Sequence, residues 1–173
     1  MNKNSLLLLG KGIFAHYKKW WPIYLLTSIL ALWFSHNYKF AINVTNSLPG
    51  TVYLIVKNEL PLKNQPMAFV WHDTEKKTPF PDGVTFLKLA GGVAGDVVLR
   101  GGDDSQILVN EWRLQPKKFS KTGLELAANG FLGKIPQGYY FAVGTHKDSL
   151  DSRYAMVGLI PSSQVIGKAY ALF

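Results

Sequence analysis

Two residues of this chain, Ser47 and Lys88, have the side chains of a nucleophile and its general base. Ser47 lies in a turn-rich segment, residues 43–50, shortly after a stretch without charged residues. Lys88 interrupts an apolar, strand-like run at residues 86–90. Burial among apolar side chains disfavours the charged form of a lysine, and a neutral amine can accept the proton of a serine hydroxyl. The two residues therefore predict a Ser-Lys dyad, a variant of the Ser-His-Asp triad.

A third polar segment, residues 149–154, contains Asp151 and Arg153. Residues two positions apart in a strand point to the same side, so we expect these two side chains to share a polar network. Each segment alone is also compatible with an ordinary structural role. A serine before Leu-Pro is common in turns, a strand lysine can face solvent, and residues 149–154 can form a solvated turn.

Together, the three segments resemble the motifs of the signal peptidase I superfamily of membrane-anchored Ser-Lys proteases, most closely its TraF-type pilin-maturation branch. Their order and spacing agree with that family over residues 40–170. The similar segments are a serine box (46–50, with Tyr53 after it), a lysine box (88–96) and a C-terminal box (149–154, with 167–169). The resemblance implies an antiparallel, mostly β protease domain with one N-terminal transmembrane helix.

The resemblance also implies a role for each matching residue. Ser47 is expected to be the nucleophile, with its backbone N–H donating to the oxyanion. Lys88 is expected to act as the general base and then as the general acid. Thr45 is expected to be the side-chain donor to the oxyanion, and Ser149 to orient the Lys88 amine. We expect Asp151 to pair with a cation such as Arg153 and not with Lys88, because a carboxylate beside Lys88 would raise its pKa.

The sequence departs from the family pattern at several positions, none of them in the dyad. Gly50 comes one residue early, Ala94 replaces a proline, residues 144–146 read Gly-Thr-His in place of Gly-Asp-Asn, and extra residues precede Gly158. These changes affect the expected shape of the substrate cleft. By the same resemblance, Asp151 and Arg153 are expected to brace the site and not to react.

Other chemistries are less well supported by the sequence. Ser47, His72 and Asp73 could be combined into a triad, but neighbouring strand residues point to opposite faces, so Asp73 could not easily orient His72. The histidines have no metal-ligand spacing, the chain has no cysteine, and its glycine-rich stretches lack a phosphate-binding pattern. The sequence predicts neither a metal site nor a cofactor.

The part of the chain after residue 40 must position the dyad. Short segments rich in β-branched and aromatic residues alternate there with Gly and Pro, which predicts antiparallel strands and not βαβ units. The expected strands are 51–57, 67–72, 84–90, 96–100, 106–109, 112–114, 139–143 and 165–172, with a hairpin turn near Asn110. Residues 115–134 are more polar and are expected to form a loop region.

Residues 20–38 contain no Asp, Glu, Lys or Arg and carry aromatic residues at both ends. This length and pattern predict a transmembrane helix. Lysines cluster before it, so the positive-inside rule places residues 1–19 in the cytoplasm and a catalytic domain, residues 40–173, in the periplasm. A cleaved signal peptide is the alternative, although the segment before the apolar run is long and no clear cleavage site follows it.

The chain has a formal net charge of +8, but its lysines are scattered, so we expect anionic lipid of the inner membrane and no nucleic acid as a partner. The predicted function is a membrane-anchored serine endopeptidase that processes an exported preprotein. The substrate that we expect is a conjugative pilin precursor, which is trimmed or also cyclised. Other conjugative transfer proteins are further expected partners. Two alternatives stay open: a general signal peptidase I, and a catalytically inactive, membrane-anchored β scaffold.

Overall fold

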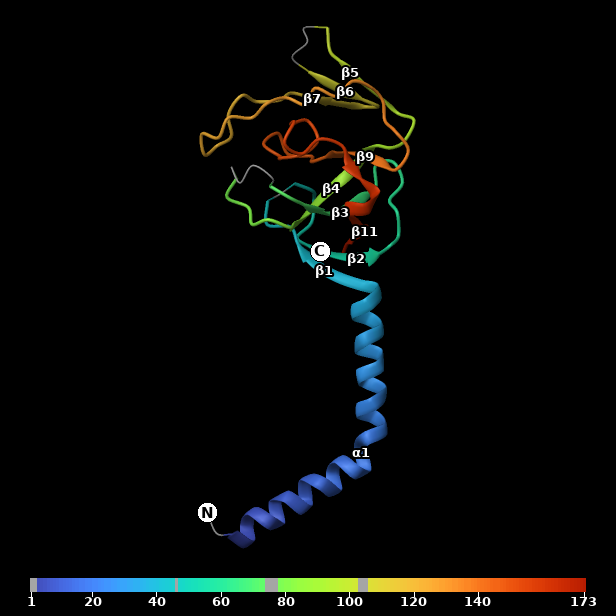
Figure 1. Ribbon diagram of the computed structural model, residues 1–173, viewed down its shortest axis with the longest axis vertical. Helices are drawn as coiled ribbons and strands as arrows, with labels where there is room; N and C mark the ends of the chain where they lie inside the picture. Colours follow the sequence, from blue (N-terminus) through green and yellow to red (C-terminus); the bar gives the residue numbers. More distant parts are fainter. Residues whose placement is uncertain (1–2, 46, 74–77, 103–105) are drawn as a thin grey trace. The chain divides into compact units, whose positions relative to one another are not determined.

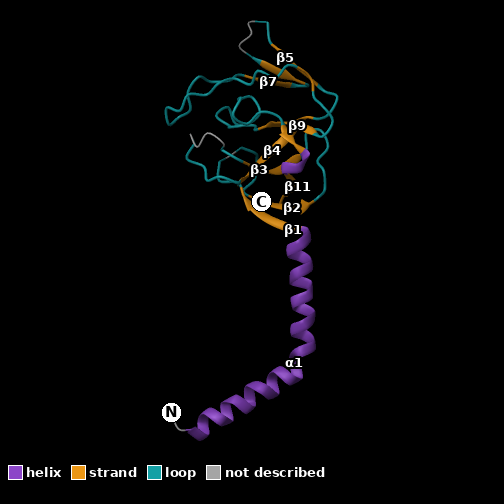
Figure 2. Ribbon diagram, viewed as in Figure 1, coloured by secondary structure: helices purple, strands orange, loops and turns teal. Residues whose placement is uncertain are grey.

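The computed structural model describes residues 3–45, 47–73, 78–102 and 106–173. The chain divides into two compact units, residues 1–37 and residues 38–173. The first unit is helical, and the second is built of strands and long loops (Figures 1 and 2). Each unit is described by itself.

The helix of the first unit, α1, runs from Lys3 to Asn37. It contains residues 20–37 of the predicted helix 20–38, since Tyr38 already belongs to a strand, and it begins much earlier than predicted. Pro22 therefore lies in the helix interior and not in the first turn, where its missing N–H would be harmless. An interior proline removes a backbone hydrogen bond and kinks the helix, which accounts for the bend of α1 in Figure 1.

The hydropathy of α1 does not support the transmembrane helix expected at residues 20–38. Among the described residues, no helix is both long enough and apolar enough to cross a membrane. Polar residues are spread along the segment, and they satisfy their side chains on the helix backbone. The Thr27 hydroxyl donates to the Ile23 carbonyl at 3.0 Å, and the Asn37 amide donates to the Trp33 carbonyl at 2.7 Å. These residues, together with several Trp and Tyr residues, lower the mean hydropathy of the segment.

The second unit contains two antiparallel sheets. The seven-stranded sheet has the order β1-β2-β11-β3-β4-β9-β10, and the four-stranded sheet has the order β7-β6-β5-β8. The strands are β1 (Tyr38–Ile42), β2 (Val52–Lys57), β3 (Pro66–Trp71), β4 (Val84–Gly92), β5 (Val97–Arg100), β6 (Ile107–Val109), β7 (Trp112–Leu114), β8 (Gly133–Lys134), β9 (Tyr139–Val143), β10 (Ile160–Pro161) and β11 (Val165–Ala171). This arrangement confirms the prediction of a mostly β, antiparallel domain.

Each strand expected from the sequence is present, with ends that differ by at most two residues. The hairpin between β6 and β7 turns at Asn110, which has a positive φ of 51°. Three strands were not expected. β1 lies at the end of the segment interpreted as a membrane span, and β8 and β10 are each two residues long, too short for a periodic pattern. Residues 115–132 form loops between β7 and β8, as expected.

The strand β4 lies at the centre of the domain and carries Lys88 in its middle. It pairs with β3 on one side and with β9 on the other. Most of its side chains are buried, because the strand contributes to the core on both of its faces. Phe86 and Ala90 pack in one apolar cluster and Leu87 packs in another. The lysine is therefore fixed in a strand that has little freedom to move.

Candidate functional site

The structure brings the three sequence boxes together in one place. Ser47 lies in the loop between β1 and β2, Lys88 lies in β4, and Ser149 lies in the loop after β9. The Nζ atom of Lys88 is 2.5 Å from the Ser47 hydroxyl and 2.8 Å from the Ser149 hydroxyl. The amine donates these hydrogen bonds when it is charged and can accept one of them when it is neutral. Asn46, which precedes Ser47 in the serine box, lies outside the described residues.

The Lys88 side chain is buried, with 3% of its surface exposed. Its Nζ atom lies 5.3 Å from the centre of the Phe86 ring. Burial is the main cause that lowers the pKa of Lys88 from its ordinary value to about 8; Arg153 also lowers it, and the Asp151 charge opposes the shift. At this pKa roughly a tenth of the amine is neutral at pH 7, far more than at the ordinary lysine pKa of about 10.4, and a general base must be neutral.

The Asp151 carboxylate is held by Arg153 and not by Lys88. Arg153 donates to it from Nε at 2.7 Å and from Nη2 at 2.8 Å, which is a bidentate pair. The backbone N–H of Gly144 donates to the same carboxylate at 2.7 Å. All three residues are buried. The structure thus shows the Asp151–Arg153 pair that the sequence suggested, and the Arg153 charge compensates the Asp151 charge that acts on the lysine.

The approach of Ser149 to the lysine depends on Gly144. A Cβ atom at Gly144 would lie 1.9 Å from the Ser149 hydroxyl oxygen, which is far too close for any side chain. Ser149 is itself buried, and its backbone N–H donates to the His146 carbonyl at 3.0 Å. The glycine that begins the altered Gly-Thr-His segment therefore makes room for the hydroxyl that holds the amine.

The Ser47 backbone is fixed by Thr145, a residue that the sequence analysis did not single out. The backbone N–H of Thr145 donates to the Ser47 carbonyl at 2.8 Å, and its hydroxyl donates to the same carbonyl at 3.1 Å. Thr145 lies at one of the positions where the chain departs from the family pattern. The departure from the pattern was the one signal in the sequence that pointed to Thr145. The contact between Thr145 and Ser47 joins residues far apart in sequence, so only the fold reveals it.

Further contacts shape the loop on either side of Ser47. The Asn43 amide donates to the Leu48 carbonyl at 2.7 Å and to the Gly50 carbonyl at 3.1 Å. The Tyr53 hydroxyl donates to the Pro49 carbonyl. Asn43 and Tyr53 are both buried, so these bonds hold the turn in a single shape. Sequence reasoning missed Asn43, although an asparagine before a turn is a recognisable signal.

The Thr45 hydroxyl lies 2.7 Å from the Ser47 hydroxyl, and either oxygen can be the donor. Thr45 also lines the cavity in front of Ser47. It is therefore close enough to reach an oxygen that develops on a carbon bonded to Ser47. Its expected role as an oxyanion donor stays a prediction.

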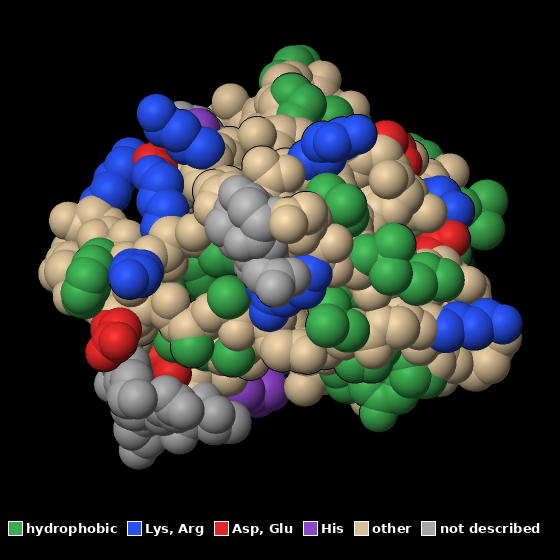
Figure 3. Space-filling model, turned by 90° about the horizontal axis from the view of Figure 1, so that it is seen from above, with side chains coloured by type: hydrophobic (Ala, Val, Ile, Leu, Met, Phe, Trp, Pro, Cys, Tyr) green, Lys and Arg blue, Asp and Glu red, His purple; other side chains and the backbone are tan. Residues whose placement is uncertain are grey.

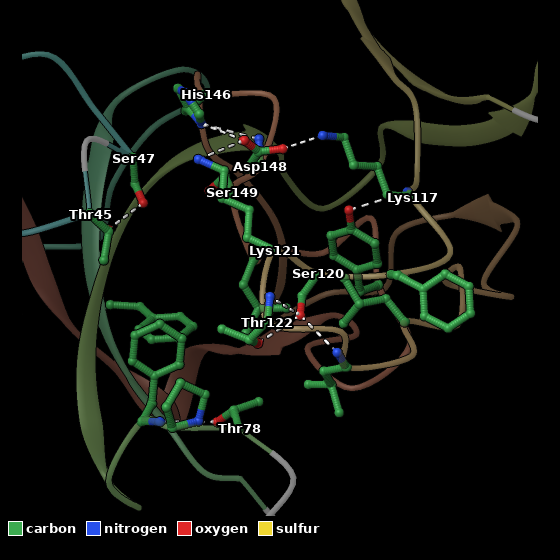
Figure 4. Close-up of a pocket in the computed structure, with 18 of the residues that line it drawn as sticks. Thr45, Ser47, Thr78, Lys117, Ser120, Lys121, Thr122, His146, Asp148 and Ser149 are labelled. Carbon is green, nitrogen blue, oxygen red and sulfur yellow. Dashed lines mark hydrogen bonds and ion pairs between the residues drawn. The ribbon is translucent and has the colours of Figure 1, made fainter.

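A cavity of about 530 Å³ opens in front of these residues, within the size range of ligand pockets. Figure 4 shows Thr45 and Ser47 on one side of it and Lys117 on the other. Apolar side chains form much of its wall: Phe80, Phe86, Phe119, Leu124, Leu126 and Leu150. Several of them belong to the loop at residues 115–132, which the sequence analysis recognised only as an irregular insertion.

The arrangement does not support a Ser47, His72, Asp73 triad. The Nδ1 atom of His72 lies 3.0 Å from the Asp82 carboxylate, and the exposed His72 side chain does not line the cavity. Asp73 accepts hydrogen bonds from the Thr78 backbone N–H and hydroxyl at 2.7 and 2.8 Å. Among the described residues, no group of three or more His, Cys, Asp or Glu side chains could hold a metal ion.

Comparison with known proteins agrees with this geometry. The family described as "Signal peptidase, peptidase S26" matches residues 14–173, which is most of the chain. A search of curated proteins gave no match. Members of this family are serine peptidases that act on preproteins. The extent of the match shows that this chain belongs to the signal peptidase family, peptidase S26.

Proposed function

We propose that this chain is a serine endopeptidase in which Ser47 and Lys88 form the catalytic dyad. One observation carries the proposal: a buried lysine with a lowered pKa lies 2.5 Å from the hydroxyl of a buried serine. A lysine buried for structural reasons alone would be expected to pair with a carboxylate. Here the Asp151 carboxylate, whose charge acts on Lys88, is already paired with Arg153, and the amine contacts two hydroxyl groups.

In the proposed mechanism, neutral Lys88 removes the proton from the Ser47 hydroxyl as its oxygen attacks the scissile carbonyl carbon. The tetrahedral intermediate carries an oxyanion, which the Ser47 backbone N–H and the Thr45 hydroxyl stabilise. When the C–N bond breaks, the Lys88 ammonium donates its proton to the leaving amine, and an acyl-enzyme remains. A water molecule activated by Lys88 then attacks the ester and releases the acid product and Ser47.

The surrounding residues keep the amine in position through this cycle. Ser149 holds Nζ toward Ser47 without adding a negative charge, so it does not raise the lysine pKa. The Asp151–Arg153 pair fixes the loop that carries Ser149, because Gly144 bonds to both members of the pair. These residues act as positioning residues and do not exchange protons with the substrate.

The proposed substrate is an exported preprotein, and more narrowly a conjugative pilin precursor. The similarity of the serine box to the pilin-maturation branch supports this choice. An acyl-enzyme can also be resolved by an amine, so cyclisation of the pilin belongs to the proposal. A general signal peptidase I is the second candidate, supported by the family match over residues 14–173. The presence of both dyad residues speaks against an inactive scaffold.

Co-expression with a pilin precursor and with a generic preprotein tests these alternatives. Intact-mass measurement of both products separates a trimmed product from a cyclised one. The cyclic product is lighter than the linear product of the same residues by the mass of one water. We expect processing of the pilin precursor and little processing of the generic preprotein. Equal processing of both would favour a general signal peptidase, and processing of neither would leave the scaffold.

We further propose that α1 attaches the enzyme to the bacterial inner membrane and that residues 40–173 face the periplasm. The charge-free stretch 20–38 and its aromatic ends support attachment, whereas the hydropathy of α1 speaks against a simple span. Reporters fused after Phe173 test the location: one active only outside the cytoplasm should give signal, and one active only inside should not. The reverse result would contradict this location.

A further inference from the structure

The cavity has a charged end that the proposed dyad does not use. It is formed by Lys117 and Lys121 from the loop 115–132, and by Asp148 with its neighbour His146 from the loop after β9. We call Lys117 and Lys121, with the Asp148 carboxylate between them, the cationic rim. Figure 3 shows Lys and Arg side chains gathered beside a hollow on the face that it draws.

The cationic rim has more positive than negative charge. Lys117 pairs with one oxygen of the Asp148 carboxylate, and Lys121 lies 3.1 Å from the other oxygen. Asp148 is the one acidic side chain among the described residues that line the cavity. The two lysines lower the pKa of Asp148 to about 2, so the carboxylate is charged at any working pH. One negative charge therefore faces two positive charges.

His146 adds no negative charge to this end of the cavity. The backbone N–H of Asp148 donates to its Nδ1 atom at 3.1 Å, so that nitrogen is an acceptor and the proton of the neutral ring is on Nε2. The ring can therefore act only as a further donor toward an anion.

The lysine amines have hydrogen-bonding capacity beyond Asp148. An ammonium group has three N–H donors, and each lysine uses a carboxylate oxygen of Asp148 for only part of them. The Asp148 side chain is 14% exposed, whereas the side chains of Lys117 and Lys121 are 45% and 75% exposed. Asp148 thus lies beneath the lysines and orients them, and their remaining N–H groups are accessible from the cavity. In Figure 4 the two side chains reach Asp148 from different directions.

The cationic rim lies close to the proposed dyad. Asp148 directly precedes Ser149, whose hydroxyl is 2.8 Å from the Lys88 amine. Neighbouring Cα atoms are about 3.8 Å apart, and an extended peptide advances about 3.3 Å per residue. Because Ser47, Lys117 and Lys121 line the same cavity, we infer that a peptide with its scissile carbonyl at Ser47 brings a residue near the scissile bond to the lysines.

The loop that carries the lysines is part of the folded domain. Within it, the Leu126 N–H donates to the Lys118 carbonyl at 2.7 Å. Beyond this pair, the Asn129 N–H donates to the Arg153 carbonyl at 2.8 Å, and the Ala155 N–H donates to the Ala127 carbonyl at 2.9 Å. The last two bonds join the loop to residues 153–155, at the end of the C-terminal box that contains Ser149. The backbone of the loop that carries the lysines is thus anchored beside the segment that contains Ser149.

We propose that Lys117 and Lys121 form a subsite that binds a carboxylate of the substrate peptide near its scissile bond. The inference rests on the proposed function and deepens it, since it selects preproteins with an acidic group at that place. The carboxylate bonds to the lysine N–H groups that Asp148 leaves available, and a basic residue is repelled. The carboxylate can come from an Asp or Glu side chain, or from the chain terminus of a short leaving peptide.

Peptide binding tests the subsite without requiring catalysis. The full-length chain with Ser47→Ala, in detergent, is titrated with fluorescent peptides of one common sequence. In these peptides each position in turn carries Glu or Gln. Each peptide is made with a free C-terminal carboxylate and with an amide. At one position we expect Glu to bind about 5- to 10-fold more tightly than Gln, because a carboxylate bonds the lysine donors in a charge-assisted manner. If the C-terminal carboxylate is the ligand, the peptide with a C-terminal amide will bind more weakly than the peptide with a free carboxylate by the same factor.

The preference for a carboxylate should disappear in Lys117→Gln/Lys121→Gln and persist in Lys118→Gln. Lys118 is a matched control, because it lies in the same loop but does not line the cavity. The melting temperature of each variant checks its folding, and Lys121→Gln alone serves if the double variant does not fold, since its side chain is exposed. A carboxylate preference that survives these changes overturns the subsite, and so does equal binding of all four peptide forms.

Cleavage by the unsubstituted chain tests the proposed function separately. If the Ser47 enzyme cleaves none of the peptides and no preprotein, the peptidase assignment fails, while the binding result still decides whether the lysines recognise a carboxylate. If it cleaves the peptides without any preference for acidic ones, the peptidase assignment stands and the subsite is wrong.

Discussion

The two ends of the cavity use lysine in opposite ways. At one end, Lys88 is 3% exposed, contacts hydroxyl groups, and has its pKa lowered by burial to about 8. At the other end, Lys121 is 75% exposed and pairs with the Asp148 carboxylate. The pKa of the first amine is lowered, so it can lose its charge, whereas the second amine is exposed and bound to a carboxylate. The surroundings, and not the residue type, decide whether a lysine acts as a base or as an anion-binding group.

The partners of two nearby carboxylates explain how one cavity can contain both lysine environments. Asp151 is buried, and Arg153 binds it with two hydrogen bonds. The Arg153 charge therefore opposes the effect of the Asp151 charge on the pKa of Lys88. Asp148 has no arginine partner and takes the exposed lysines instead. Two acidic residues three positions apart are thus paired in different surroundings: Asp151 with a buried arginine behind the dyad, and Asp148 with exposed lysines at the cavity wall.

Removing either member of the dyad should have the largest effect. Ser47→Ala and Lys88→Ala should each reduce processing by about 10⁴-fold or more, because residues of a catalytic unit act together. Lys121→Ala should reduce it only a few-fold. Product formation measured by mass spectrometry decides, with circular dichroism as the folding control. Near-normal processing by Lys88→Ala would contradict the assignment of the buried lysine as the base.

Thr45 should give the next largest effect. Thr45→Val removes the hydroxyl that lies 2.7 Å from the Ser47 oxygen and should lower turnover about 10²- to 10³-fold, the usual effect of losing one oxyanion donor. Thr45→Ser keeps the hydroxyl and should retain most of the activity. The measurement is kcat for one peptide substrate with all three enzymes. If Val is as active as Thr, the side-chain donor is elsewhere.

The pH dependence of turnover should distinguish the role of Lys88 from that of Lys121. Because the Lys88 pKa is lowered to about 8, the neutral base is present above that pH and is lost as the pH falls. Turnover should therefore rise about tenfold per pH unit below about pH 8 and level off above it. The limb should be unchanged in Lys121→Gln, since that amine does not take part in proton transfer. A limb that appears only near pH 10 would contradict the buried environment of Lys88.

The sequence predicted the end of the cavity around Lys88 better than the end around Lys117 and Lys121. Ser47, Lys88 and Ser149 belong to local patterns with a specific order, and an apolar run around a lysine already signals its burial. The strands that carry the core were found for the same reason. The loop that carries Lys117 and Lys121 has no periodicity, so nothing in the sequence indicated that it folds over the site. Thr145 was missed because its contact with Ser47 depends on tertiary structure alone.

The N-terminal helix was the other place where sequence and structure disagree. The absence of charge at residues 20–38 predicted a span, but absence of charge is a weaker condition than high hydropathy. Thr27, Ser35 and Asn37 are uncharged and polar, and the helix accommodates them by bonding their side chains to its own backbone. Charge counting therefore found the helical conformation of residues 20–37, missed the helical residues before them, and overstated the apolar character of the segment.

Salt should produce the smallest effect and the sharpest contrast between the two ends. Exposed charges are screened beyond a Debye length of about 10 Å at 0.1 M salt, and this length shortens as salt rises, whereas buried groups are screened much less. Raising NaCl from about 0.05 M to about 0.5 M should increase KM for an acidic peptide about 3- to 5-fold, as expected for exposed ion pairs. It should leave kcat nearly unchanged, because the contact between Lys88 and Ser47 is buried.

The same salt series on the Gln peptide provides the control, since that peptide has no charge for the cationic rim to bind. Asp148→Asn gives a second check. It removes the carboxylate that shares the lysines, so it should lower KM for the acidic peptide at low salt and make that KM more sensitive to salt. If salt instead changes kcat and leaves KM constant, the charged end does not contribute to binding. The contrast between the two lysine environments would then concern structure and not substrate selection.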